Sequence, residues 1–86
     1  MTLDEIKTTI QKAVPQAEVF IQDPMNDGQH LRAFVISPAF EGMPLIKQHQ
    51  MVMGPLTQAF ATSVHALALK TFTPTKWNSE KNKFGL

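Results

Sequence analysis

Cysteine is absent from this chain of 86 residues. Its absence excludes a disulfide framework, a thiol nucleophile, and any zinc or iron–sulfur site that the chain's own cysteines would ligate. A metal bound to this protein must therefore be held by histidines, by carboxylates or by ligands that a partner supplies.

The sequence also lacks a charge imbalance and a long hydrophobic run. Eight basic and seven acidic residues leave a net charge of +1, whereas dedicated DNA-binding domains usually carry a clear basic excess. No apolar run approaches the roughly 20 residues needed to cross a bilayer, and the N-terminus does not have the pattern of a secretory signal. We therefore expect a cytoplasmic or organelle-matrix protein that does not insert into membranes.

What is present favours one folded domain over residues 1–86. The composition is 43% hydrophobic without a low-complexity tract, which is typical of a globular protein. The length leaves no room for a second core.

Hydrophobic periodicity predicts two long helices. Thr2 and Glu5 form a capping box for the first, which we expect to end at about residue 14 because proline follows. The second begins at Pro44 and extends to about residue 60. Pro55 inside it predicts a kink or a local break near residues 51–54.

Three strands and a short helix complete the pattern. Residues 17–22 and 30–37 alternate as strands and are joined by turn residues. The most apolar run, residues 63–77, predicts a third strand that extends to about residue 72 and is covered on both faces. Thr73 caps a last helix that extends to about Lys81, and we expect the remaining tail to be frayed.

The predicted order is α-β-β-α-β-α, an α+β fold with a three-stranded mixed sheet and helices packed on it. Strands one and two form an antiparallel hairpin, and strands two and three are parallel through a right-handed crossover. His30 opens the second strand and His65 opens the third, so both histidines are expected at one edge. Each could instead be a boundary residue without a ligand role, and the pattern alone leaves both roles open.

Several motifs in fixed order resemble the BolA-like proteins. They are Phe40-Glu41-Gly42, the predicted helix start Leu45-Ile46-Lys47-Gln48-His49, Val64-His65-Ala66-Leu67 and Thr73-Pro74-Thr75-Lys76-Trp77. The start of the second strand, Asp27-Gly28-Gln29-His30-Leu31, is similar to the short-loop bacterial branch of that family. The resemblance covers roughly residues 3–80 and implies a fold related to class II KH domains.

The resemblance also implies a function without turnover chemistry. BolA-like proteins pair with monothiol glutaredoxins and share a [2Fe–2S] cluster, to which the partner contributes its cysteine and a glutathione thiol. The resemblance makes His65 one ligand and His30 the second, and it implies no cofactor in the isolated chain. The implied role is iron–sulfur trafficking or iron sensing, with a link to stress response.

An alternative is a KH-like nucleic-acid-binding transcriptional regulator. The candidate contacts are Lys47, His49, Lys76 and Lys81, although His49 could equally be a packed residue and the lysines a solvated face. Where the family commonly has an RHR-like run, this chain has Lys47-Gln48-His49-Gln50, with two positive charges fewer. A homodimer whose apo state hides the histidine edge is a third alternative. The residues indicate no catalytic Ser/His/Asp constellation, so an enzyme is not expected.

Overall fold

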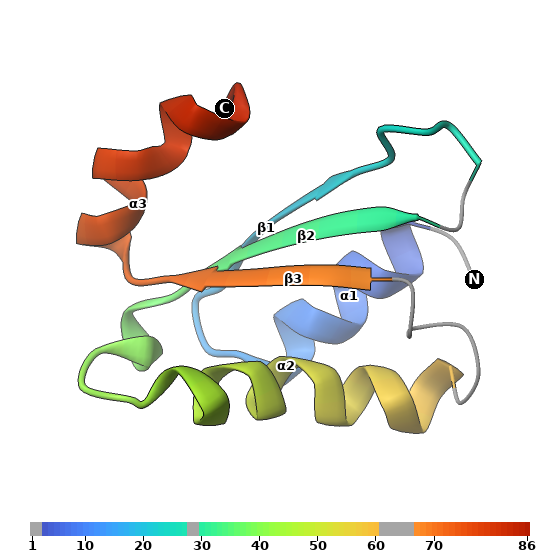
Figure 1. Ribbon diagram of the computed structural model, residues 1–86. Helices are drawn as coiled ribbons and strands as arrows, with labels where there is room; N and C mark the ends of the chain where they lie inside the picture. Colours follow the sequence, from blue (N-terminus) through green and yellow to red (C-terminus); the bar gives the residue numbers. More distant parts are fainter. Residues whose placement is uncertain (1–2, 28–29, 61–66) are drawn as a thin grey trace.

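The computed structural model describes residues 3–27, 30–60 and 67–86, and it has the predicted element order (Figure 1). The elements are α1 (Leu3–Ala13), β1 (Glu18–Gln22), β2 (Leu31–Ile36), the 3-10 turn η1 (Pro38–Phe40), α2 (Leu45–Phe60), β3 (Leu67–Phe72), α3 (Pro74–Glu80) and the 3-10 turn η3 (Lys81–Phe84). Where the structure describes the end of a helix or strand, that end lies within a few residues of the predicted one. None of the helices in the described ranges is long and apolar enough to span a membrane.

The sheet is mixed, as the sequence predicts, and its strand order is β1-β2-β3. β1 pairs with β2 antiparallel, and β2 pairs with β3 parallel in a register that sets Leu31 opposite Leu67 and Ile36 opposite Phe72. Helices α1 and α2 lie against one face of the sheet and α3 lies on the other (Figure 1). The central strand β2 is therefore covered on both faces.

The two faces of the sheet carry two separate cores. Side chains alternate along β2, so Leu31 and Val35 face α1 and α2 while Phe34 and Ile36 face α3. The larger core contains Ile6, Ile10, Val14, Val19, Leu31, Val35, Phe40, Val52 and Leu56. The smaller one is mainly aromatic, and Trp77 on α3 stacks on Phe20 with ring centroids 5.6 Å apart. Trp77 thus packs the last helix against the sheet.

Ser37 joins three parts of the chain at the end of β2. Its fully buried hydroxyl donates to the carbonyl of Pro15 at 2.6 Å and accepts the amide of Ala39 at 3.1 Å. Its own backbone amide donates to the carbonyl of Phe72 at 3.1 Å. The α1–β1 connection, η1 and the end of β3 are therefore fixed to one another at this residue.

The break expected near residues 51–54 does not occur, because α2 continues as one helix through Pro55. Proline removes one backbone hydrogen bond from the helix. Val52 and Leu56 flank the site and are both fully buried in the larger core. Burial of an apolar side chain stabilises by about 1.5–3 kcal/mol, so these two anchors offset the cost of the proline.

The expectation of a third strand covered on both faces was wrong. β3 is an edge strand in which Ala68 and Lys70 are exposed, and only its last two residues are buried. The crossover adds β3 beside β2 with no further strand outside it, so one edge of β3 has no backbone partner among the described residues.

The tail was also expected to be frayed, and it differs from that expectation. Residues Lys81–Phe84 form η3, which ends at Gly85 in the left-handed conformation (φ 74°) that favours glycine. The ring of Phe84 lies 4.8 Å from that of Phe34 and 6.2 Å from that of Trp77, measured between centroids. The carbonyl of Phe84 accepts a hydrogen bond from the Gln22 side chain at 3.2 Å. Aromatic packing therefore holds the tail on the sheet.

Candidate functional site

His30 stands immediately before β2, at the end of a loop that folds on its own aspartates. The Asp23 carboxylate accepts the backbone amide of Asp27 at 3.2 Å, and Asn26 adopts the left-handed conformation (φ 52°) that asparagine tolerates. Oδ1 of Asp27 in turn accepts the backbone amide of His30 at 3.0 Å. The local chemistry of the loop thus positions the histidine.

The imidazole of His30 is oriented by the same aspartate. Its Nδ1 lies 2.7 Å from Oδ2 of Asp27, and 61% of the His30 side chain is exposed. With Nδ1 donating to the carboxylate, the lone pair of a neutral ring lies on Nε2. A carboxylate behind Nδ1 is the usual orienting partner of a metal-ligating histidine.

The second predicted ligand, His65, lies outside the residues that the structure describes. The described part of the sheet does establish where β2 and β3 begin. Leu31 and Leu67 are register partners, so the first residues of the two strands lie at the same end of the sheet. Over the described ranges, no group of three or more His, Cys, Asp or Glu side chains could hold a metal ion.

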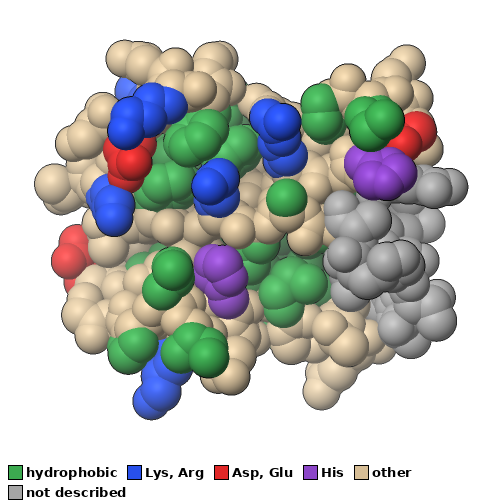
Figure 2. All heavy atoms as spheres, in the orientation of Figure 1, with side chains coloured by type: hydrophobic (Ala, Val, Ile, Leu, Met, Phe, Trp, Pro, Cys, Tyr) green, Lys and Arg blue, Asp and Glu red, His purple; other side chains and the backbone are tan. Residues whose placement is uncertain are grey.

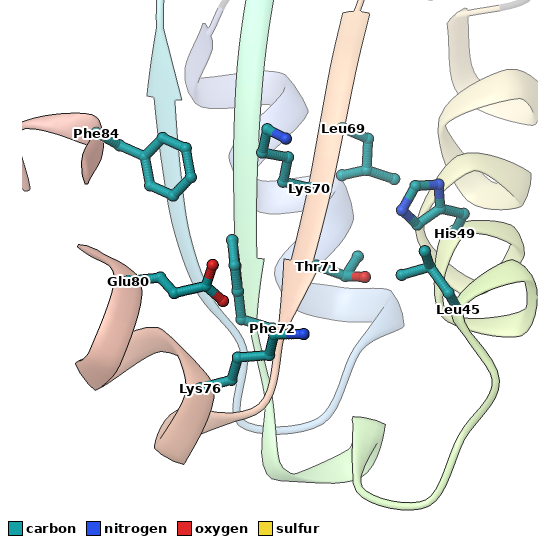
Figure 3. A pocket seen from close by; sticks show the side chains of 9 residues that line it. All are labelled: Leu45, His49, Leu69, Lys70, Thr71, Phe72, Lys76, Glu80 and Phe84. Atoms are coloured by element: carbon teal, nitrogen blue, oxygen red, sulfur yellow. The ribbon is translucent and has the colours of Figure 1, made fainter. Parts of the chain in front are cut away.

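Four other candidates were predicted as partner- or nucleic-acid-binding residues, and two of them line a groove of about 280 Å³ along β3. His49 on α2 and Lys76 on α3 approach it from opposite sides of the strand (Figure 3). Lys47 is exposed on α2 and Lys81 is half-buried in η3, and neither lines the groove. The four residues therefore do not form one basic surface on the second helix.

The groove also contains residues that were not among the predicted site residues. Leu45 and Leu69 line it on the α2 side, and Lys70 and Glu80 line it on the α3 side. Oε1 of Glu80 lies 3.5 Å from Nζ of Lys83, while Oε2 is buried without a hydrogen-bond partner among the described residues. A charged Lys70 within an apolar run is a signal of an edge strand, and it was the one available clue to this groove.

A polar network fixes the end of the groove at which Thr71 lies. The hydroxyl of Thr71 donates to Oε1 of Gln48 at 2.6 Å, and Nε2 of Gln48 donates to the carbonyl of Met43 at 2.8 Å. Nearby, Gly42 has φ 71°, a conformation that glycine adopts without strain. The network fixes the start of α2 against the end of β3.

The fold and the site define a small α+β domain with an exposed, carboxylate-oriented histidine at the start of its central strand. A family model described as BolA-like protein matches residues 2–76, so the chain belongs to the BolA-like family. The chain is 30% identical to the acid stress protein IbaG of Escherichia coli (strain K12) over 86 residues, which is 99% of each chain. It is 39% identical to BolA-like protein 1 of Mus musculus over 54 residues, 63% of this chain and 39% of the relative.

Solved structures agree with this assignment. A bolA protein homologue from Coxiella burnetii superimposes with a TM-score of 0.74 at 32% identity, covering 91% of this chain and 97% of the other. The BolA domain of SufE1 from Arabidopsis thaliana gives a TM-score of 0.68 at 26% identity, covering 85% and 92% respectively. The mixed three-stranded sheet with helices on both faces is thus the fold of the family.

Proposed function

We propose that this protein is an adaptor that binds a monothiol glutaredoxin and co-ligates a shared [2Fe–2S] cluster through His65 and His30. The chain would contribute two imidazoles, and the partner would contribute its cysteine and a glutathione thiol. The proposed role is iron–sulfur trafficking or iron sensing. Membership of the BolA-like family supports this proposal.

The observation that carries the proposal is the geometry of His30. The ring is exposed, and its Nδ1 lies 2.7 Å from the Asp27 carboxylate. Such a ring keeps Nε2 available for a metal and pays little rotational entropy on binding, because both its backbone amide and its Nδ1 are already held. The pairing of Leu31 with Leu67 supports a second ligand from the start of β3.

The donor set also fits a cluster that two molecules share. The chain has no cysteine, and the described residues hold no group of three metal-ligating side chains. Histidine ligands in place of thiolates raise the reduction potential of a [2Fe–2S] centre. The thiolates would therefore have to come from the partner.

The test is to mix the purified chain with a cluster-loaded monothiol glutaredoxin and to record visible absorption and circular dichroism spectra. We expect a new spectrum that differs from that of the glutaredoxin alone. The new features should be lost in His65→Ala and weakened in His30→Ala. Gln11→Ala, which shortens an exposed side chain on α1, is the control and should leave them intact. A glutaredoxin spectrum that the wild-type chain leaves unchanged would sink the proposal.

A further inference from the structure

The open edge of β3 is the feature that the proposed cluster chemistry does not use. Figure 3 shows β3 between α2 and α3, with Leu45 and His49 on one side of the strand and Lys76 and Glu80 on the other. In the same orientation as Figure 1, the space-filling view shows lysine and arginine side chains gathered over α3 and β3 (Figure 2). The groove thus combines a strand edge with a basic side.

The backbone of β3 has hydrogen-bonding groups to offer along this edge. The carbonyl of Phe72 accepts the amide of Ser37, so Phe72 and alternate residues before it direct their backbone groups toward β2. Leu69 and Thr71, between them, direct theirs to the other side. An added strand could therefore pair with Leu69, which is partly exposed, without displacing any hydrogen bond of the sheet, whereas Thr71 itself is buried in the free chain.

The two sides of the groove differ in chemistry. On the α2 side, Leu45 is 61% exposed and Leu69 is partly exposed, so an apolar surface remains uncovered. On the α3 side, Lys70 and Lys76 are exposed, and the carboxylate of Glu80 already faces Lys83 at 3.5 Å. Adjacent strands in a sheet place side chains alternately on the two faces. An added strand would hence meet apolar and basic surfaces in turn.

We propose that the open edge of β3 binds an extended segment of another protein in which apolar and acidic residues alternate. The apolar residues would contact Leu45 and Leu69, and the acidic ones would pair with Lys70 and Lys76. Strand addition to a sheet edge obtains affinity from the backbone and specificity from alternate side chains.

Other occupants fit the groove less well. A second copy of this chain paired edge to edge would bring its own Lys70 beside this one, and like charges on neighbouring strands are destabilising. The volume of about 280 Å³ is below the range of about 300–1,000 Å³ common for small-molecule clefts. The charge of the groove therefore selects an acidic peptide.

The experiment uses the full chain, isotopically labelled for NMR, without glutaredoxin or metal. The probe is a capped six-residue peptide that alternates glutamate and valine. We expect shifted amide signals at Leu69 and Thr71, and slower amide exchange at Leu69, which is partly exposed in the free chain. A peptide of the same composition with three glutamates followed by three valines should bind about tenfold more weakly, because it cannot match both faces.

Charge reversal tests the acidic preference. The affinity of the double variant Lys70→Glu/Lys76→Glu for the glutamate–valine peptide should fall at least about tenfold. The variant should instead bind a peptide that alternates lysine and valine. Both lysines are exposed, so the amide spectrum should otherwise stay that of the folded protein. Lys7→Glu is the matched control, since this exposed lysine on α1 lies at the β1 side of the sheet.

Four results would overturn the proposal. They are unchanged β3 amides at millimolar peptide, equal affinity for the two sequence orders, dimerisation of the free chain through β3 in sedimentation, and preferential binding of an oligonucleotide to the same amides. The assay contains no cluster, so its failure would leave the glutaredoxin test unaffected.

Discussion

Asp27 holds His30 at two points: its Oδ1 accepts the histidine's backbone amide at 3.0 Å, and its Oδ2 lies 2.7 Å from the ring Nδ1. One side chain therefore sets both the backbone position and the ring orientation at the start of β2. The pair is solvent-exposed, with 61% of the His30 side chain and 34% of the Asp27 side chain accessible. Such an exposed pair adds little to stability, which leaves its effect on the histidine as its main consequence.

The first prediction concerns this pair. Asp27→Ala should weaken formation of the shared-cluster complex about 10- to 100-fold, because loss of a carboxylate behind a ligating histidine typically has that effect. The measurement is a titration of cluster-loaded glutaredoxin followed by visible circular dichroism. Asp4→Ala removes the same charge from exposed α1 and should leave the titration unchanged. Equal affinity of Asp27→Ala and wild type would mean that the pair has no role in ligation.

The second prediction concerns the buried hydroxyl of Ser37. Ser37→Ala leaves the Pro15 carbonyl and the Ala39 amide without their partner, so the free energy of unfolding should fall by about 1–3 kcal/mol. Urea denaturation measures this change. Ser79→Ala removes an exposed hydroxyl, 3.4 Å from the Thr75 carbonyl, and should cost no more than about 0.5 kcal/mol. Similar losses in the two variants would contradict the joining role assigned to Ser37.

The third prediction concerns the bond between Thr71 and Gln48 at the groove. A double-mutant cycle of Gln48→Ala and Thr71→Val should show a coupling free energy of about 0.5–1.5 kcal/mol, as expected for one intramolecular hydrogen bond. The two side chains come from α2 and β3, so the coupling also measures how firmly the helix is fixed to the edge strand. Gln48→Ala combined with Thr57→Val, two turns or more further along α2, should be additive within about 0.5 kcal/mol.

The fourth prediction decides between a frayed and a docked tail. Phe84→Ala should destabilise the protein by about 1–3 kcal/mol, less than for a fully buried phenylalanine, since the ring is only half-buried. It should also change the fluorescence of Trp77, the single tryptophan, because the two rings stack at 6.2 Å. Leu86→Ala shortens an exposed side chain and is the control, so its stability and its Trp77 fluorescence should stay close to those of the wild type. A Phe84→Ala variant with wild-type stability and fluorescence would instead favour the frayed tail that the sequence predicts.

Much of the fold is predictable because its determinants are local. The helical spacing of Ile6 and Ile10, both buried, marks the inner face of α1. Thr73 caps α3 by accepting the Lys76 amide, as the Thr-Pro sequence indicates. The alternation along β2 assigns Leu31 and Phe34 to opposite cores, and this too follows from the period of a strand.

The candidate site was predictable only in part. The sequence indicates His30 and His65 as strand-start residues. The structure places His30 directly before β2, where Leu31 pairs with Leu67 of β3, whereas His65 lies outside the described residues and its role stays a prediction. The role of Asp27 escaped prediction, although its position three residues before His30 was visible. Whether a loop turns back far enough for such a contact depends on backbone dihedrals, which the residue types favour but do not specify.

By itself, the sequence determined the type and order of the elements and which side chains of β2 face each of the two cores. It also determined that any thiolate ligand must come from another molecule, since the chain has no cysteine. Tertiary structure alone decided that β3 is an open edge beside Lys70 and Lys76, that α2 continues through Pro55, and that Phe84 packs on Trp77. The physical reason is range: periodicity and capping act within a few residues, whereas strand order, burial and ring packing join residues far apart in the chain.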